Sequence, residues 1–184
     1  MQEISFITGN NDKFREAQLL IPQLNRKDID LPEEQSLDPR HVIWRKVEEA
    51  KKHTSHRFVV EDTSLYLDGL NGFPGPLIKW MLDAVGTKGI YNLCSAIHDR
   101  GAVAKTVIGL YDPQADDILY FEGSTDGKIV SPSGNEGFGW DDIFQPNGLD
   151  ETFAAMGSDF KPEFSMRTQA FNGLKLHLQN NSML

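Results

Sequence analysis

The sequence predicts a mixed α/β fold, and two observations support this prediction. Short apolar segments alternate with helix-like stretches in the N-terminal third of the chain. Later, two strand-like segments, 103–110 and 118–121, follow each other across an acidic turn that begins at Asp112-Pro113, as in an antiparallel hairpin. Alternating strands and helices favour a parallel sheet, and the hairpin adds antiparallel strands. We therefore expect a mixed sheet with flanking helices rather than a purely doubly wound fold.

The N-terminal part is expected to alternate strands and helices. The apolar run at 4–8 predicts a short buried strand. Apolar residues along one helical face predict helices at 11–21 and 38–52. Between them a weakly marked strand is expected at 27–31, where it ends at a proline. A further strand at 57–61 leads directly into two adjacent carboxylates.

The rest of the chain is expected to be richer in loops and helices. A loop rich in glycine and proline runs to residue 76, and the apolar pattern then predicts helices at 77–85 and 88–98, which would form a helical lobe. A second glycine-rich loop is expected at 131–139. The chain closes with a helix at 165–179, whose first residue, a serine, is a suitable N-cap.

Length and composition limit the function classes. The chain has 184 residues, enough for one domain, with or without two lobes, and for a sizeable core. Hydrophobic residues make up 39% and aromatic residues 10%, which excludes wholesale disorder. The 18 basic and 27 acidic side chains give a net charge of −9 without a basic run, so no nucleic-acid partner is expected. A small anionic substrate is compatible with this charge, because a few lysines and a metal suffice locally.

The cysteine content and the N-terminus bear on location. The single cysteine, Cys94, lies in a helix-like stretch and cannot form an internal disulfide, which fits a reducing compartment. A packed thiol is the favoured interpretation, and a nucleophile is the alternative. The N-terminus lacks the pattern of a signal peptide, and no apolar run approaches the ~20 residues of a membrane span. We expect a soluble, cytoplasmic protein with no membrane partner.

Adjacent carboxylates mark the most informative segment. Glu61 and Asp62 follow an apolar strand, with Thr63 next and a glycine- and proline-rich loop after it. Like charges this close are costly to bury unless a cation compensates, and Mg²⁺ prefers carboxylate, water and phosphate oxygens. A second acidic pair, Glu33-Glu34, is a candidate for another metal carboxylate. The structural alternatives are a hydrogen-bonded turn at Asp62-Thr63 and a solvated turn at Glu33-Glu34.

The segment Thr8-Gly9-Asn10-Asn11-Asp12-Lys13 lies between the first strand and the first helix. A glycine turn at a helix start exposes backbone N–H groups at the positive end of the helix dipole, which suits a phosphate group. Thr8 and Asn10 can donate from their side chains, and Lys13 adds a positive charge. The segment lacks the second glycine of a Walker A loop, and the alternative is a plain strand–turn–helix connection.

Aromatic residues between glycines follow in the C-terminal half. Phe138 and Trp140 can present a flat face to a nucleobase, at about 1–3 kcal/mol per stacked base. Asp141 can accept ring N–H hydrogens. The alternative is an aromatic edge of the core. Arg167, near the start of the last helix, can donate to a base carbonyl or pair with a surface carboxylate.

Taken in order, these segments resemble the inosine triphosphate pyrophosphatase family, which hydrolyses deaminated purine nucleoside triphosphates. The matching motifs are TGNxxK at 8–13, LPE at 31–33, EDT and GFPGPxIKW within 61–80, FGWD at 138–141, FQPxG at 144–148 and TxA at 152–154. They follow the family's order and spacing over residues 4–175. The segments GFPGPLIKW and FGWD indicate the branch that includes the eukaryotic enzymes.

The resemblance implies a role for each matching polar residue. The residues that would bind the triphosphate are Thr8, Asn10, Lys13 and Lys46. The ligands of Mg²⁺ would be Glu33 and Asp62. The catalytic residues would be Lys13, Glu61 and Asp62. The base pocket, its lid and the start of the closing helix would be formed by Phe138, Trp140, Asp141, Lys161, Ser165 and Arg167.

The resemblance also implies the architecture and the reaction. The family fold is an elongated α/β structure of two lobes with a nucleotide cleft between them, and its members are usually homodimers. We therefore expect a single pyrophosphatase domain over residues 1–184, with a nucleoside triphosphate as substrate. Water would attack the α-phosphorus in a Mg²⁺-dependent reaction and release a monophosphate and pyrophosphate. Either Glu61 or Asp62 would orient or deprotonate the water, and the sequence favours neither.

Several residues depart from the family pattern. Met166 stands where the family has histidine between serine and arginine, so one base contact is lost or replaced. The spacing of Met166 with Ala170 and Leu174 also suits a core residue. Asp142 replaces the usual proline, and Ala155 replaces the usual glutamate. These departures affect base selectivity rather than phosphate chemistry.

Two other hypotheses remain open. Met166 is compatible with a pyrophosphatase of different base choice, such as the Maf-like enzymes that act on pyrimidine nucleotides. The other hypothesis is a nucleotide-binding module without catalysis, although the presence of Lys13, Glu33 and Asp62 argues against it. A panel of nucleotides, with a test for binding without turnover, distinguishes these hypotheses.

Overall fold

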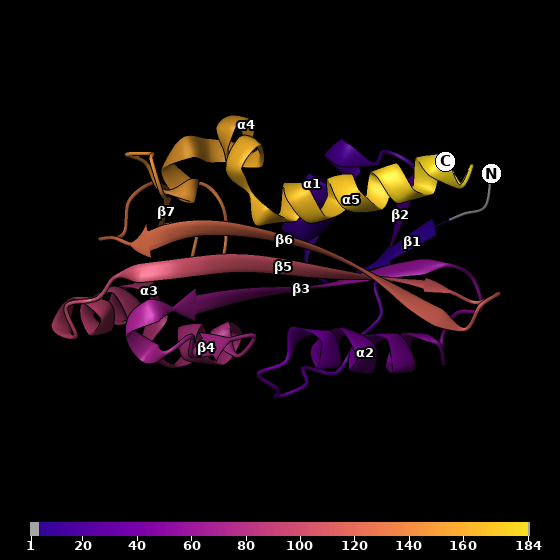
Figure 1. Cartoon of the computed structure of the whole chain (residues 1–184), viewed down its shortest axis with the longest axis horizontal. Helices are drawn as coiled ribbons and strands as arrows, with labels where there is room; N and C mark the ends of the chain where they lie inside the picture. Colours follow the sequence, from indigo (N-terminus) through magenta and orange to yellow (C-terminus); the bar gives the residue numbers. More distant parts are fainter. Residues whose placement is uncertain (1–3, 184) are drawn as a thin grey trace. The chain divides into compact units, whose positions relative to one another are not determined.

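The computed structural model describes residues 4–183, and of Ser158 and Asp159 it describes the backbone alone. Strands and helices alternate in the N-terminal third of the chain, whereas consecutive strands and two consecutive helices occur in the C-terminal half (Figure 1). The strands are β1 Ile4–Ile7, β2 Leu24–Lys27, β3 Phe58–Leu67, β4 Pro74–Gly75, β5 Gly101–Asp112, β6 Asp117–Ile129 and β7 Phe144–Pro146. The helices are α1 Asn11–Leu20, α2 Pro39–Ala50, α3 Ile78–Ala96, α4 Phe153–Phe164 and α5 Met166–Asn180, with a short 3₁₀ turn at Asp68–Leu70.

The strands form a mixed sheet in the order β2-β1-β3-β5-β6-β7, with β4 paired to β3. β1 pairs in parallel with β2 and β3, so that Phe6 lies beside Arg26 and Val59. β4 pairs antiparallel with β3, and β7 pairs antiparallel with β6. β5 and β6 are neighbours joined by the short turn 113–116, which is the predicted hairpin. The expectation of a mixed α/β fold with flanking helices is confirmed.

The chain divides into two compact units. Unit 1 comprises the residues up to 62, residues 106–123 and those from 167 onward. Unit 2 comprises residues 63–105 and 124–166. A single domain over the whole chain and a nucleotide cleft between two lobes stay predictions.

In unit 1, alternate residues of β3 bury their side chains on opposite faces of the sheet. Phe58 and Val60 pack in one apolar cluster with Ile43 and Val47 of α2. Val59 packs in a different cluster, with apolar residues of α1 and α5. Figure 1 shows α2 on one side of these strands and α1 with α5 on the other. Consecutive residues of β3 therefore face different helices.

The strand order of unit 1 reverses at β1. β1 leads through α1 to β2 on one side, and β2 leads through α2 to β3 on the other side of β1. Because such crossovers are right-handed, the two helices cover opposite faces of the sheet. Open α/β sheets bind ligands at the carboxyl ends of strands where the order reverses. In this chain that place is the end of β1 and the adjoining part of β3, which carry residues 8–13 and Glu61-Asp62.

Unit 2 has an apolar core of its own. Leu65 and Leu67 of β3 pack in it with Ile78, Ile90 and Cys94 of α3. Cys94 is fully buried, and burial raises the pKa of its thiol. A thiol of this kind is a poor nucleophile, so the predicted packed cysteine is confirmed.

Helix α3 bends sharply at Gly86, whose φ of 66° and ψ of 175° lie outside the helical region. The two helices predicted at 77–85 and 88–98 therefore lie on either side of this bend. Across residues 4–183, no helix has both the length and the apolar character needed to cross a membrane.

Strand β2 differs from its predicted position. It occupies Leu24–Lys27 rather than 27–31, because Leu24 is the buried residue that pairs with Ile4 of β1. The residues after Lys27 lead into the loop before α2. Most of the predicted segment 27–31 therefore belongs to this loop.

Strand β3 is longer than predicted, and helix α4 is additional. β3 continues to Leu67, so Asp62 and Thr63 lie inside a strand and the alternative of a turn there is wrong. The two carboxylates interrupt the apolar pattern, but cations on the neighbouring helices compensate them. The apolar pattern of α4 is interrupted by Gly157 and Pro162, which explains why the sequence did not indicate it.

Candidate active site

The end of β1 and the start of α1 hold the predicted phosphate loop. Asn10 is the N-cap of α1, and its Oδ1 accepts hydrogen bonds from the N–H groups of Asp12 and Lys13 at 2.9 and 3.1 Å. Thr8 Oγ1 accepts a hydrogen bond from the Asn10 N–H at 3.1 Å. These contacts fix the turn at the positive end of the helix, where an anion is stabilised. Asn10 thus caps the helix, a role that its prediction as a side-chain donor did not include.

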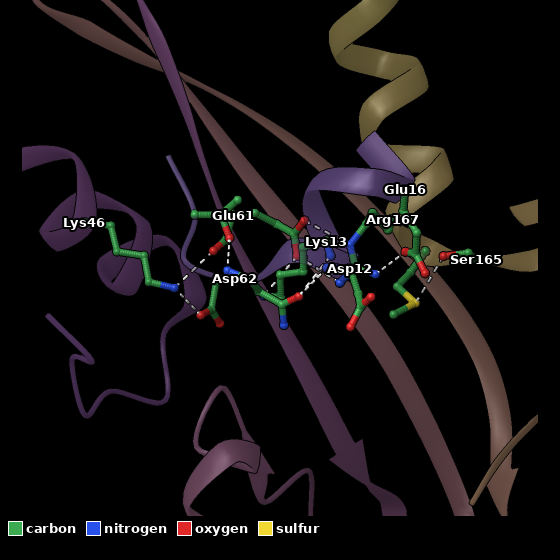
Figure 2. Close-up of polar contacts among 11 residues, drawn as sticks. Asp12, Lys13, Glu16, Lys46, Glu61, Asp62, Ser165 and Arg167 are labelled. Atoms are coloured by element: carbon green, nitrogen blue, oxygen red, sulfur yellow. Dashed lines mark hydrogen bonds and ion pairs between the residues drawn. The ribbon is translucent and has the colours of Figure 1, made fainter. Parts of the chain in front are cut away.

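Glu61 projects toward α1 and α5 and is neutralised within the protein. Arg167 donates from Nε to Oε2 and from Nη2 to Oε1, both at 3.0 Å, and Lys13 Nζ lies 3.2 Å from Oε1. Arg167 Nη1 also donates to Glu16. The Glu61 side chain is fully buried, which these two cations make tolerable. Figure 2 shows the cluster of Lys13, Glu16, Glu61 and Arg167.

Arg167 pairs with carboxylates, which is one of the two kinds of partner predicted for it. Burial opposes the charged guanidinium, but the carboxylates of Glu61 and Glu16 outweigh this effect and raise the pKa of Arg167. Arg167 therefore stays charged and bound to carboxylates, one of them fully buried. Its contact with a base stays a prediction. Sequence reasoning missed Glu16, although a position one helical turn after Lys13 was a usable signal.

Asp62 projects to the opposite face, toward α2. Lys46 Nζ donates to Asp62 Oδ1 at 2.7 Å and to the Glu61 carbonyl oxygen at 3.0 Å. Burial opposes the charged form of Lys46, but the carboxylates of Asp62, Glu33 and Glu61 raise its pKa above the ordinary value. Asp62 Oδ2 is buried and has no hydrogen-bond partner within residues 4–183. Since a buried carboxylate oxygen without a donor is costly, this atom favours a bound cation or water.

Glu33 is the second predicted metal ligand. It is exposed in the loop between β2 and α2, and its charge acts on Lys46 as that of Asp62 does. Its neighbour Glu34 is instead bound by Arg45 at 3.3 Å. The described part of the chain contains no group of three or more His, Cys, Asp or Glu residues that could hold a metal. Mg²⁺ needs no such group, because it keeps waters and takes phosphate oxygens. The carboxylates of Glu33 and Asp62 are oxygen ligands of the kind that it prefers, and their binding of Mg²⁺ stays a prediction.

In unit 2, Lys161 of α4 holds the segment 138–141. Lys161 Nζ lies 2.7 Å from Asp141 Oδ2, which also accepts the Phe138 N–H at 2.9 Å. The same ammonium lies over the rings of Phe138 and Phe153, at 4.7 and 5.6 Å from their centroids. Lys161 and Asp141 are both buried. The structure thus brings together Phe138, Asp141 and Lys161, which the resemblance assigns to one pocket.

Trp140 and Met166 belong to the apolar core of unit 2. The Trp140 ring packs edge-to-face on Phe144 and tilted on Phe153, with centroids 5.4 and 6.5 Å apart. Met166 is 2% exposed, and the Oγ of buried Ser165 lies 3.9 Å from its Sδ. Met166 is therefore a core residue, which is one of the two alternatives that the sequence allowed. A role for Trp140 in a base pocket stays a prediction.

Known families and proteins match the chain along nearly its whole length. The Ham1 family model matches residues 4–177. The chain belongs to the Ham1 family. The inosine triphosphate pyrophosphatase of Batrachochytrium dendrobatidis is 40% identical to it over 188 residues, which cover 100% of this chain and 98% of that protein. The resemblance predicted from the motifs is thus confirmed.

Solved structures of Ham1 proteins share the fold. The Staphylococcus aureus Ham1 protein has a TM-score of 0.81 and 26% identity, with 97% of this chain and 99% of that chain covered. A HAM1 protein from Coxiella burnetii has a TM-score of 0.84 and 26% identity, with 98% of this chain and 100% of that chain covered. The nucleoside-triphosphatase, or dITP/XTP pyrophosphatase, of Mycobacterium abscessus has a TM-score of 0.72 and 28% identity, with 93% of this chain and 97% of that chain covered. The mixed sheet with its flanking helices is that of Ham1 proteins.

Proposed function

We propose that this Ham1 enzyme hydrolyses the deaminated purine nucleoside triphosphates ITP, dITP and XTP to the monophosphate and pyrophosphate, with Mg²⁺ as cofactor. The names of the 40% identical relative and of the Mycobacterium abscessus structure support this substrate class. One observation carries the proposal for the chemistry. The buried Asp62 Oδ2 lacks a partner, although a lysine ammonium binds the other oxygen of the same carboxylate.

The proposed reaction depends on charge neutralisation and alignment more than on covalent help. Lys13 and Lys46 approach β3 from opposite faces, at Glu61 and at Asp62 respectively. Their ammonium groups would stabilise the charge that develops on the pyrophosphate leaving group. Glu33 and Asp62 would hold Mg²⁺, which when bound neutralises phosphate oxygens and acidifies water.

The contacts of the two adjacent carboxylates favour Asp62 over Glu61 for orienting the attacking water. Arg167 engages both side-chain oxygens of Glu61, and Lys13 engages one of them again. Asp62 Oδ2, by contrast, can accept a hydrogen bond from water. Glu61 would then position Lys13 rather than act on the water.

Base selection would depend on residues of unit 2. The partly buried Phe138 ring would stack on the base, and Asp141 would accept its ring N–H hydrogen. A protein donor that faces position 6 of the base would donate a hydrogen bond to an oxo group there. The amino group of adenine would instead place two donors against each other, and each buried group left without a partner costs about 1–3 kcal/mol. Rejection of guanine must depend on position 2. The other residues predicted for the pocket are Trp140, Lys161, Ser165 and Arg167.

The assembly and location of the enzyme also belong to the proposal. We expect a homodimer, as the family resemblance implies, and a cytoplasmic location without a nucleic-acid partner, as the composition implies.

A nucleotide panel tests the proposed substrates. With Mg²⁺, pyrophosphate release is expected to be strongly faster on ITP, XTP and dITP than on ATP, GTP, dTTP and UTP. Removal of Mg²⁺ with a chelator is expected to stop the reaction, and added Mg²⁺ to restore it. A flat or pyrimidine-leaning profile would support the Maf-like alternative instead. Tight binding of triphosphates without turnover would support the non-catalytic module.

A core role for Met166 predicts that its exchange for leucine has little effect on selectivity. Met166→Leu keeps the volume of the buried side chain, so it is expected to cost less than about 1.5 kcal/mol of stability. The ratio of kcat/KM for ITP over ATP is expected to stay near that of the unchanged enzyme. Leu65→Met, the reverse exchange in the same core, is the matched control. A change of about tenfold or more in the ratio for Met166→Leu alone would assign Met166 to base recognition.

A further inference from the structure

Arg26 of β2 binds the backbone of the predicted phosphate loop. Its Nε donates to the Thr8 carbonyl oxygen and its Nη2 to the Gly9 carbonyl oxygen, both at 3.0 Å. Its Nη1 donates to Asn11 Oδ1. One side chain thus contacts three of the four residues from Thr8 to Asn11. Sequence reasoning did not select Arg26, because the predicted strand begins at residue 27 and Arg26 lies just before it.

β2 also accepts a hydrogen bond from the backbone N–H of Thr8, the first residue of the loop. The Thr8 N–H donates to the Lys27 carbonyl oxygen at 3.2 Å, while Arg26 binds the Thr8 carbonyl oxygen. Both backbone polar groups of Thr8 are therefore held by consecutive residues of β2. The end of β1 is fixed against β2 before the chain enters the turn.

These contacts determine where the N–H groups of the loop point. In a trans peptide the C=O and N–H groups point in opposite directions. Because Arg26 binds the carbonyl oxygens of Thr8 and Gly9, the N–H groups of Gly9 and Asn10 point away from the guanidinium. The Asn10 N–H then meets Thr8 Oγ1, at 3.1 Å. A cation on the carbonyl oxygens also polarises each peptide, which strengthens its N–H as a donor.

The charge of Arg26 is compensated by a nearby carboxylate. Asp28 Oδ2 lies 3.0 Å from Arg26 Nη2 and compensates the guanidinium locally. The distinctive property of arginine here is its planar fork, which donates to several acceptors at fixed angles. A lysine ammonium at this position would supply the charge without the fork.

We propose that Arg26 is a positioning residue for the triphosphate: it holds the carbonyl oxygens of Thr8 and Gly9, and so fixes the turn and presents the Gly9 N–H to the phosphate groups. This inference rests on the proposed function insofar as residues 8–13 bind the triphosphate. It adds a residue on β2 that acts through the backbone and does not itself touch substrate.

The test compares three variants of the full chain. Arg26→Met removes the fork and the charge, and Arg26→Lys removes the fork alone. Arg15→Met is the matched control, because it removes the same charge from an exposed residue of α1. The Arg15 guanidinium lies 3.6 Å from the Asp12 carboxylate. Each variant is examined by calorimetric titration with inorganic tripolyphosphate in Mg²⁺, by KM and kcat for ITP, and by the melting temperature without ligand.

Both Arg26 variants are expected to bind tripolyphosphate about tenfold or more weakly than the unchanged protein, as the loss of a charged group's hydrogen bonds implies. KM for ITP should rise by a similar factor with a smaller change in kcat, whereas Arg15→Met should match the unchanged protein. Full binding by Arg26→Lys would overturn the proposal, because charge alone would then suffice. Full binding by Arg26→Met would overturn it as well. If Arg26→Met does not fold, Arg26→Lys decides.

The titration separates this inference from the proposed function. An unchanged protein that binds tripolyphosphate but hydrolyses no triphosphate would contradict the proposed function, and the Arg26 variants would still be decided by binding. An unchanged protein that hydrolyses ITP but binds tripolyphosphate as well without Arg26 would contradict this inference alone. Absence of tripolyphosphate binding by the unchanged protein would overturn the inference.

Discussion

Asp62→Asn is expected to abolish measurable turnover of ITP while the fold stays intact. The amide keeps the shape of the side chain and still accepts the hydrogen bond from Lys46, but it removes the anionic oxygen that lacks a partner in the protein. The loss of kcat is expected to be on the order of 10³-fold, as is typical when one group that stabilises transition-state charge is lost. Steady-state kinetics with saturating Mg²⁺ measure this effect, and circular dichroism checks the fold.

The matched control for this variant is Asp112→Asn. Asp112 is also a carboxylate of unit 1, and it binds Arg57 at 2.9 Å outside the proposed site. Its exchange removes a comparable ion pair, so the melting temperature should fall while kcat stays near that of the unchanged enzyme. Near-normal turnover by Asp62→Asn would remove Asp62 from the mechanism.

Among the proposed variants, Arg167→Met is expected to lower the free energy of unfolding the most. Arg167 is 1% exposed and makes both hydrogen bonds of a bidentate pair with Glu61, whose side chain is fully buried. Methionine fills much of the same volume but leaves Glu61 with Lys13 as its compensating cation. Removal of one partner from a buried ion pair typically costs about 3–5 kcal/mol. For a chain of this length the melting temperature should fall by roughly 10 °C.

A double-mutant cycle tests the physical reason for this loss. Glu61→Gln removes the buried charge that Arg167→Met would leave without its main partner. The double variant should therefore be less destabilised than the sum of the two single variants, as measured by urea denaturation. Additive effects would mean that Arg167 stabilises the protein through packing rather than through the ion pair.

The features of the site that could be predicted depend on residues that are close together in the sequence. Asn10 and Lys13 follow a short apolar strand and open a helix, so their place at a helix N-terminus could be derived from neighbouring residues alone. The importance of Glu61 and Asp62 could likewise be inferred, because adjacent carboxylates after an apolar run need compensation. Local pattern does not, however, distinguish a strand that ends at a charged pair from one that continues through it.

The unpredictable part depends on contacts between distant segments. Arg167 and Glu61 are separated by 106 positions in the chain, so no periodicity in the sequence links them. Met166 and Trp140 show the same limit, since their spacing suited both a core and a pocket. The packing of Trp140 on Phe144 and Phe153, which only the folded chain reveals, places the tryptophan in the core.

The placement of Glu61 and Asp62 on opposite faces of β3 has a consequence for how the enzyme handles charge. Two neighbouring carboxylates in a loop would compete for one proton and for one cation. Here the backbone of a single strand acts as a partition between them. Glu61 keeps permanent counter-charges supplied by the fold, from Arg167 and Lys13. Asp62 has a fixed counter-charge, Lys46, on one oxygen only. In the proposed function its other oxygen would take the transient charge, so that a fixed and an exchangeable counter-charge would lie one residue apart.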